Sequence, residues 1–145
     1  MKTGHIGINV SDIGRSKQFY TRAFGLEEMG SSDEAGKQFA FLGEGGTLYV
    51  TLWQQSEGPF NAHTPGLHHL SFEVDSIEKV REAQGRVRDM GAEFLYQSVV
   101  PHAEGMQSGG IFFRDPDGIR LEIYAPSGAN EADAPSGAMP SCGFF

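Results

Sequence analysis

The chain contains an internal repeat, and this repeat constrains its fold more than any other feature. Residues 5–10 read HIGINV and residues 69–74 read HLSFEV, so both segments begin with histidine and place large apolar side chains at alternate positions. Each segment is followed by acidic or hydroxyl residues that can cap a helix, and then by a helical pattern that stops at Gly25 or Gly91. A duplication of this kind predicts two equivalent modules in one chain.

Strand-like runs follow the predicted helix in each half. They are residues 38–42 and 47–53 in the first half, and residues 94–99, 110–114 and 119–124 in the second. A glycine-rich turn joins the last two runs of the first half, and a turn with the sequence DPDG joins those of the second half. Turns of these kinds are typical of antiparallel hairpins. A linker that contains glycine and proline, residues 58–66, separates the halves. We therefore expect a single domain over residues 1–126, with modules at 3–57 and 67–126.

The C-terminal segment differs in composition from the rest of the chain. Up to residue 141 it consists mainly of Ala, Gly, Ser, Pro and acidic residues without periodicity, which predicts a flexible tail over residues 127–145. The tail ends in CGFF, an apolar tip that holds the one thiol of the chain, Cys142. We hypothesise that this tip packs on protein surface near a cleft or a dimer seam, because two terminal phenylalanines would otherwise lie in water. The alternative is a frayed terminus.

Composition argues against several classes of function. The 145 residues have a formal net charge of −8, which is unfavourable for binding nucleic acid, since phosphate backbones are bound by clusters of Lys and Arg. No apolar run of about 18 residues is present, so no membrane span is expected, and the N-terminus lacks the pattern of a signal peptide. With Cys142 alone, an internal disulfide is excluded. We expect a cytoplasmic protein without nucleic-acid or membrane partners.

Side chains alternate across a strand, so sequence parity separates the two faces of each predicted strand. Apolar side chains share one face, and the opposite face carries His5, His69 and Glu122. Two imidazoles and one carboxylate are the ligands of a facial-triad metal site, whose open coordination positions accept water or substrate. Because the two histidines occupy equivalent places in the repeat, we predict a metal site at these three residues.

Three aromatic residues share the type of face that carries the predicted ligands. They are Tyr49, Trp53 and Tyr124. Clefts that bind small molecules are commonly lined by aromatic side chains, so these residues are candidates for substrate binding. Ordinary packing between the modules is the alternative.

The other histidines receive different interpretations. Parity puts His68 with the apolar side chains of its strand, which predicts a structural role. His63 and His102 lie in predicted loops. Either could act as a base beside the metal, but an exposed loop histidine is the favoured interpretation for each.

The positions of these residues make the chain similar to the vicinal oxygen chelate superfamily. This superfamily is the group of glyoxalases, bleomycin-resistance proteins and extradiol dioxygenases. The motifs that carry the resemblance are residues 4–10, 16–26, 67–74 and 113–122, and the match extends over residues 3–126. The resemblance implies an α+β fold of two βαβββ modules with pseudo-twofold symmetry, in which a curled mixed sheet surrounds a metal cleft. We also expect a homodimer, in which the modules pair within one chain or across the two chains, since the linker at residues 58–66 permits either arrangement.

The same resemblance assigns ligand roles to His5, His69 and Glu122, with Mn, Fe, Zn, Ni or Co as the divalent metal ion. In this group substrate oxygens chelate the metal, which stabilises developing oxyanion charge as a Lewis acid. We therefore expect a metal-dependent enzyme that acts on a small, oxygen-rich substrate. The alternative is a binding protein of the antibiotic-resistance type that sequesters its ligand without catalysis.

The reaction stays open between lyase, dioxygenase and thiol transferase, because the chain departs from each pattern. Four-ligand glyoxalases add a carboxylate from the first module, where this chain offers Tyr49, Thr51 or Val50. Ring-cleaving dioxygenases place a tyrosine where this chain has Phe112. Thiol transferases of the fosfomycin-resistance type need a cationic pocket, and Arg120 is the only cation on the predicted cleft face.

Overall fold

The computed structural model describes residues 3–135 and 137–144. The elements of the first module are β1 Ile6–Val10, α1 Ile13–Phe24, β2 Glu27–Ser32, β3 Phe39–Glu44 and β4 Thr47–Gln54. Those of the second module are β5 Leu70–Glu73, α2 Ile77–Asp89, β6 Val100–Pro101, β7 Gly109–Arg114 and β8 Arg120–Ala125. A short 3-10 helix, η1 Ser141–Gly143, follows. Neither of the described α-helices has the length and apolar character that a membrane span requires.

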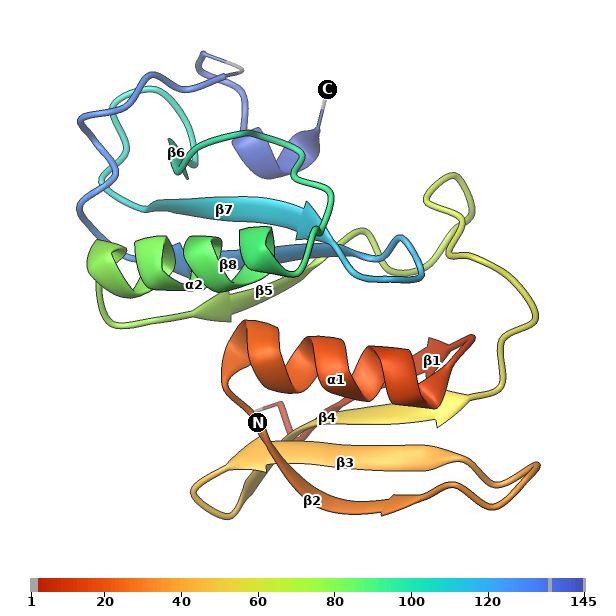
Figure 1. Ribbon diagram of the computed structural model, residues 1–145. Helices are drawn as coiled ribbons and strands as arrows, with labels where there is room; N and C mark the ends of the chain where they lie inside the picture. Colours follow the sequence, from red (N-terminus) through yellow and green to blue (C-terminus); the bar gives the residue numbers. More distant parts are fainter. Residues whose placement is uncertain (1–2, 136, 145) are drawn as a thin grey trace. The chain divides into compact units, whose positions relative to one another are not determined.

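The repeat in the sequence folds into two sheets of the same topology. The first sheet has the strand order β1-β4-β3-β2, and the second has the order β5-β8-β7-β6. In each sheet the first strand of the module runs parallel to the last, and the other neighbours are antiparallel. One helix covers each sheet (Figure 1). The predicted α+β fold of two βαβββ modules is confirmed, and the relation of the modules by pseudo-twofold symmetry stays a prediction.

Local signals in the sequence determine where both helices begin. α1 begins where the Asp12 carboxylate accepts a hydrogen bond from the Arg15 backbone N–H at 2.8 Å, and it ends at Gly25, whose φ of 70° is easily adopted without a Cβ. α2 begins at Ser76, whose hydroxyl accepts from the Lys79 N–H at 3.4 Å. Each cap satisfies a backbone donor of the first turn that has no partner within the helix.

Each helix buries one apolar face against its own sheet. The buried side chains of α1 include Ile13, Phe19, Tyr20 and Ala23, and those of α2 are Ile77, Val80, Ala83 and Val87. α1 packs on β3 and β4, and α2 packs on β7 and β8. Removal of this apolar surface from water is the main favourable term in folding. The helices thus occupy one face of each sheet and leave the other face for the predicted site residues.

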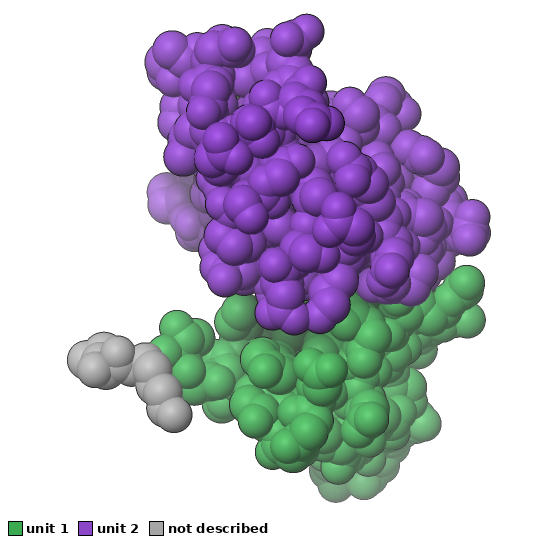
Figure 2. Space-filling model, turned by 90° about the vertical axis from the view of Figure 1, so that its left-hand side faces the viewer, with its two compact units in different colours: residues 1–61, 116–118 green, residues 62–115, 119–145 purple. Residues whose placement is uncertain are grey.

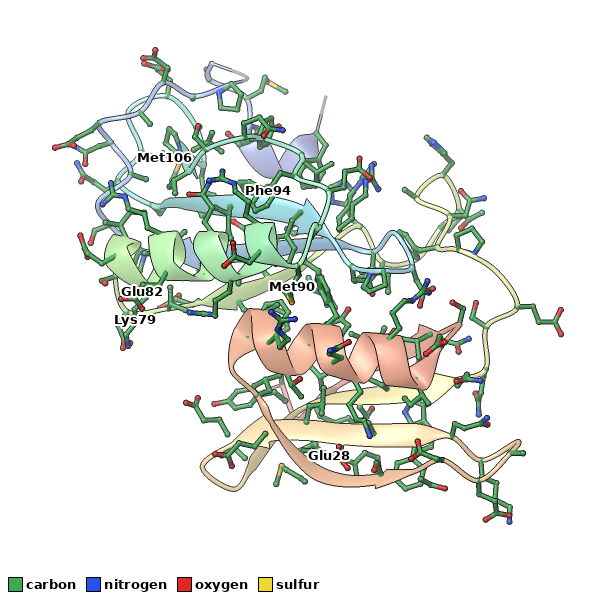
Figure 3. All side chains as sticks on the ribbon, viewed as in Figure 1. Glu28, Lys79, Glu82, Met90, Phe94 and Met106 are labelled. Carbon is green, nitrogen blue, oxygen red and sulfur yellow. The ribbon has the colours of Figure 1, made fainter. Side chains whose placement is uncertain are left out.

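The outer edges of the two sheets differ from the sequence prediction. β2 was not predicted, because its Glu and Gly residues have weak strand propensity; its pairing with β3 overrides that preference. The strand predicted at residues 94–99 is wrong. There Phe94 makes an isolated bridge to Phe113 of β7, and the edge strand is the two-residue β6. Figure 3 labels Phe94, which lies in the chain that follows α2.

The chain divides into two compact units (Figure 2). Unit 1 contains residues 1–61 and 116–118, and unit 2 contains residues 62–115 and 119–145. The turn residues 116–118 join unit 1 through Asp117, whose buried carboxylate accepts hydrogen bonds from the Ser11 N–H at 3.0 Å and the Arg15 guanidinium at 2.7 Å. The structure describes each unit by itself, and the single domain over residues 1–126 stays a prediction.

The C-terminal segment, for which the sequence predicts a flexible tail, packs on unit 2 near its end. Ser141 is fully buried, and its N–H donates to the His102 carbonyl at 2.7 Å. Its hydroxyl donates to the Pro101 carbonyl at 2.6 Å, and its own carbonyl accepts from the Tyr96 hydroxyl at 2.8 Å. These partners come from loops distant in sequence, which no local pattern reveals, and the flexible tail over residues 127–145 stays a prediction. Phe145, part of the predicted apolar tip, lies outside the described residues.

Candidate metal site in the second module

Glu122 of β8 is a buried carboxylate, with only 3% of its surface exposed. Its neighbours in register are Ser71 of β5 and Phe112 of β7, neither of which carries a charge. An ionised carboxylate loses much of its hydration in such a place, so it needs hydrogen-bonding or charged partners. The partners of Glu122 therefore define the candidate site.

His69 is the first of these partners. It directly precedes β5, and it lies two residues before Ser71, the register partner of Glu122, so it shares the face that carries the carboxylate. Its Nε2 lies 3.6 Å from Glu122 Oε2. The parallel pairing of β5 with β8 thus brings together two of the three predicted metal ligands.

The surroundings of His69 favour the neutral imidazole. Burial lowers the pKa of His69 below its ordinary value, against the opposing effect of the Glu122 carboxylate. Charge on His68, Arg120 and His102 lowers this pKa further. Neutral imidazole is the form of histidine that binds a metal ion. The side chain is therefore in the protonation state that a ligand requires near neutral pH.

His102 is the second partner of Glu122, although the sequence favours an exposed loop histidine at this position. Its Nε2 lies 2.6 Å from Glu122 Oε1, and its Nδ1 lies 2.8 Å from the Ser108 hydroxyl. In the tautomer that fits both contacts, Nε2 donates to the carboxylate and Nδ1 accepts from Ser108. The ring also packs 5.2 Å from that of Tyr124.

The hairpin of β6 and β7 explains this position. Pro101 pairs with Gly109, so His102 and Ser108 directly follow and precede the paired residues and close the loop between them. The exposed loop histidine that the sequence favours is wrong here, since the His102 side chain is 21% exposed and bonded at both nitrogens. The position of this loop depends on a long-range contact, because it is the pairing of the β6–β7 hairpin with β8 that brings the loop to Glu122.

Unit 2 offers a metal ion a neutral imidazole and a buried carboxylate. Within the described ranges, 3–135 and 137–144, no group of three or more His, Cys, Asp or Glu residues is arranged to hold a metal ion. His102 lies beside this pair, but both of its ring nitrogens are already engaged, Nε2 with Glu122 and Nδ1 with Ser108. Nitrogen and carboxylate donors fit Mn, Fe, Zn, Ni or Co. The His69–Glu122 pair therefore fits a divalent ion that receives at least one further ligand.

His5, the third predicted ligand, belongs to unit 1. It is exposed and directly precedes β1, as His69 directly precedes β5. This equivalent place in the repeat supports its assignment, and its role as a ligand stays a prediction.

The predicted substrate-binding aromatics are divided between the units. In unit 1, Tyr49 is 42% exposed and Trp53 is 38% exposed. The Trp53 Nε1–H donates to the Thr51 hydroxyl at 3.1 Å. In unit 2, Tyr124 donates its hydroxyl proton to Glu73 and lies beside His102. The structure therefore brings one of the three aromatics, Tyr124, to the candidate site, and the substrate-binding role of all three stays a prediction.

Cys142 lies close enough to Glu122 for the charge of the carboxylate to affect the pKa of the thiol. Burial raises the pKa of the Cys142 thiol, and the Glu122 carboxylate raises it further. A thiolate is the form that attacks reagents or binds metals. The thiol therefore stays protonated near neutral pH while no metal ion is bound.

Comparison with known proteins gives a family and several relatives. The family model described as "Glyoxalase/Bleomycin resistance protein/Dioxygenase superfamily" matches residues 2–123. The uncharacterized protein YqjT of Bacillus subtilis (strain 168) is 29% identical over 128 residues, which cover 85% of this chain and 98% of YqjT. The trivalent organoarsenical cleaving enzyme of Bacillus sp. (strain MD1) is 28% identical over 124 residues, covering 86% of this chain and 73% of the enzyme. A manganese-dependent 2,3-dihydroxybiphenyl 1,2-dioxygenase of Geobacillus genomosp. 3 is 27% identical over 127 residues, covering 85% of this chain and 36% of that enzyme.

Solved structures share the fold. The glyoxylase/bleomycin resistance protein/dioxygenase domain from Frankia sp. EAN1pec matches with a TM-score of 0.69 and 26% identity, covering 86% of this chain and 91% of that domain. The fosfomycin resistance protein FosX of Listeria monocytogenes, complexed with Mn(II) and a sulfate ion, matches with a TM-score of 0.65 and 24% identity. The match covers 87% of this chain and 90% of FosX. At this identity the likeness to FosX is one of fold.

Proposed function

We propose that this chain, which belongs to the Glyoxalase/Bleomycin resistance protein/Dioxygenase superfamily, is a divalent-metal-dependent enzyme that acts on a small, oxygen-rich substrate. Its metal ion is held by His5, His69 and Glu122. The observation that carries the proposal is the approach of His69 Nε2 to within 3.6 Å of the buried Glu122 carboxylate. Such a pair is costly to bury without a function, since the carboxylate gives up hydration.

Manganese is the first ion to test, although Fe, Zn, Ni and Co suit the same donors. Two similar proteins support this order. One is a manganese-dependent dioxygenase, and the other is FosX with Mn(II) bound. The choice of metal in this chain belongs to the proposal.

Each residue of the site has a part in the proposed chemistry. When bound, the metal ion supplies a Lewis acid that polarises a substrate oxygen. His69 offers a neutral nitrogen, and Glu122 brings the negative charge that balances a cation. His102, held by Ser108, donates to one oxygen of Glu122 and so keeps the carboxylate in one orientation.

A homodimer is part of the same proposal. Met29, Tyr49 and Trp53 are large apolar side chains of unit 1 that lie exposed on β2 and β4. Exposed apolar side chains of this size are common at protein interfaces. Sedimentation equilibrium at micromolar concentration tests the point: a dimer is expected, and a monomer would contradict it.

Metal titration tests the function. The untagged protein, stripped with chelator, is titrated with Mn(II) by isothermal calorimetry beside His69→Ala, His5→Ala and the loop control His63→Ala. We expect one site per chain in the wild type and the control, and a loss of affinity of about 100-fold or more in the ligand variants, beyond the effect of a residue that only supports a ligand.

The two ligand variants separate parts of the proposal. Unchanged affinity in His69→Ala would contradict the metal site as a whole, whereas unchanged affinity in His5→Ala alone would remove only that ligand. A substrate screen on the metal-loaded wild type then distinguishes the enzyme from the alternative, a protein that sequesters a ligand. Turnover that requires the metal supports the enzyme, and binding without turnover supports the alternative.

A further inference from the structure

The C-terminal segment holds the Phe144 ring among four side chains of unit 2. The Phe144 ring lies 5.7 Å from that of His68 with the planes 21° apart, and 6.3 Å from that of Tyr96 at 26°. Phe112 meets it edge to face at 5.5 Å. The Arg120 guanidinium carbon lies 5.0 Å from its centre. We call His68, Tyr96, Phe112 and Arg120 the ring surface.

The ring surface adjoins the candidate metal site. His68 and His69 are adjacent in sequence, and their Nδ1 atoms are 2.8 Å apart. Phe112 is the register partner of Glu122. The Phe144 ring itself lies 6.0 Å from the ring of His69. Whatever occupies the place of Phe144 therefore sits next to the proposed metal ligands.

The backbone of Phe144 indicates that its ring contacts hold it in place. Its φ of 54° is the one positive value at a non-glycine position among residues 3–135 and 137–144. This left-handed conformation is unfavourable for a residue with a Cβ, and it persists where surrounding contacts over-determine it. The ring remains partly exposed even so. A partly exposed ring on a strained backbone is a contact that a competitor can replace.

Arg120 gives a second indication that this place can receive a ligand. Its Nε is buried and has no hydrogen-bond partner in the structure, while its Nη1 lies 3.4 Å from His68 Nε2. A buried N–H without an acceptor carries the full cost of desolvation. An anionic group on a bound molecule would supply the acceptor that the phenyl ring of Phe144 cannot.

We propose that the ring surface receives a planar aromatic group with an anionic substituent, and that Phe144 occupies this place in the free protein as an intramolecular plug. The proposal rests on the proposed function in that the ring surface is the substrate side of the metal site. Two flat faces, His68 and Tyr96, accept a stacked ring, and Phe112 contacts the ring by its edge. Arg120 attracts both the π face and the anion. Ser141, anchored by its three hydrogen bonds, tethers the plug while the ring leaves.

Benzoate is the probe that tests competition with the plug. Its binding is measured by calorimetry on the metal-free wild type, on Phe144→Ala and on Met139→Ala, a matched variant whose exposed side chain lies on the same segment. Removing the plug raises the fraction of protein that can bind, so we expect benzoate to bind Phe144→Ala about three- to tenfold more tightly than the wild type. Met139→Ala is expected to bind as the wild type does.

Two further measurements test whether the ligand must be aromatic and whether the C-terminal segment competes for the ring surface. Cyclohexanecarboxylate has the same charge without a planar ring, and it is expected to bind Phe144→Ala more weakly than benzoate does. A synthetic peptide of residues 139–145 is expected to displace benzoate from this variant. Phe144→Leu, which keeps an apolar side chain at the position, replaces Phe144→Ala if thermal melting shows that the alanine variant is not folded.

The outcomes separate this proposal from the proposed function. Equal affinity for benzoate in the wild type and Phe144→Ala, or weaker binding in the variant, would overturn the plug, whatever the metal titration gives. Preferential binding of cyclohexanecarboxylate would overturn the aromatic class of ligand. If benzoate competes as expected while Mn(II) does not bind any variant, the metal-dependent function fails and the plug stands.

Discussion

The two modules share a topology but differ at the position that decides the site. Gly7 of β1 pairs with Thr51 of β4, just as Ser71 of β5 pairs with Glu122 of β8. Gly7 and Ser71 each lie two residues after the histidine of their repeat, so Thr51 is the equivalent of Glu122. Both are buried, but the first is a hydroxyl and the second a carboxylate. The repeated topology thus provides one buried carboxylate at this position, not two.

The outer edges of the sheets differ in a related way. The first module ends in the six-residue β2, whereas the second ends in the two-residue β6. The loop after β6 carries His102 to Glu122, and its backbone carbonyl accepts the hydrogen bond that anchors Ser141. Because β6 is short, less backbone is paired at this edge of the sheet. More of the chain is therefore left in the loop that contacts Glu122 and Ser141. The buried carboxylate and the loop histidine that contacts it therefore both belong to the second module.

The largest expected effect concerns the difference between Thr51 and Glu122. Glu122→Gln keeps the shape of the side chain but removes its charge, so we expect Mn(II) affinity to fall by about 100-fold or more, beyond the 10- to 100-fold typical of residues that only support a ligand. The equivalent change in the first module, Thr51→Val, is expected to leave affinity unchanged. Calorimetric titration measures both. Equal effects of the two changes would break the comparison.

The next effect tests the support that His102 gives to Glu122. We expect His102→Ala to weaken Mn(II) binding by about 10- to 100-fold, because the carboxylate loses the partner that orients it. Ser108→Ala, which leaves the His102–Glu122 contact in place, is expected to have a smaller effect. A loss in His102→Ala as large as that in His69→Ala would instead make His102 a ligand itself.

The pH dependence of metal binding tests the state of His69. Because burial lowers its pKa, the imidazole stays neutral as the pH falls until it reaches a value below the ordinary one of about 6.5. Below that value protons compete with the metal, and affinity is expected to drop by about tenfold per pH unit for each histidine ligand. Mn(II) titrations between pH 8 and pH 5, run by calorimetry, measure the profile. Loss of affinity that begins well above about pH 6.5 would contradict the shifted pKa.

The same shift predicts the stability of the metal-free protein. The unfolded chain binds the proton on His69 more readily than the folded one, so stability falls as the pH drops through and below about 6.5. We expect His69→Gln to lose less stability than the wild type over this range, as measured by urea unfolding at pH 7.5 and pH 5.0. A steeper loss in the variant would contradict the direction of the shift.

The smallest expected effects compare the two helix caps. Asp12→Ala removes a cap with a 2.8 Å hydrogen bond and is expected to cost about 1 kcal/mol of unfolding free energy, whereas Ser76→Ala, with its longer bond of 3.4 Å, is expected to cost about 0.5 kcal/mol. Urea unfolding followed by circular dichroism measures both changes. A larger loss in Ser76→Ala would show that bond length does not rank the caps.

The sequence by itself determined the repeated architecture. Alternating apolar residues, capping residues and the glycine stops at Gly25 and Gly91 act within a few positions of one another, so their effects can be read without knowledge of the rest of the chain. Parity also put His69 and Glu122 on one type of strand face, and the pairing of β5 with β8 then brought them together.

Tertiary structure alone decided the features that depend on pairing between distant segments. β2 forms against its local propensity because β3 supplies its hydrogen bonds, and the segment at 94–99 stays irregular because the edge of its sheet is taken by β6. His102 reaches Glu122 across 20 positions of sequence, and Ser141 reaches Pro101 across 40. Such contacts depend on strand register and loop closure, which are set by the whole fold and leave no periodic signal in the residues that make them.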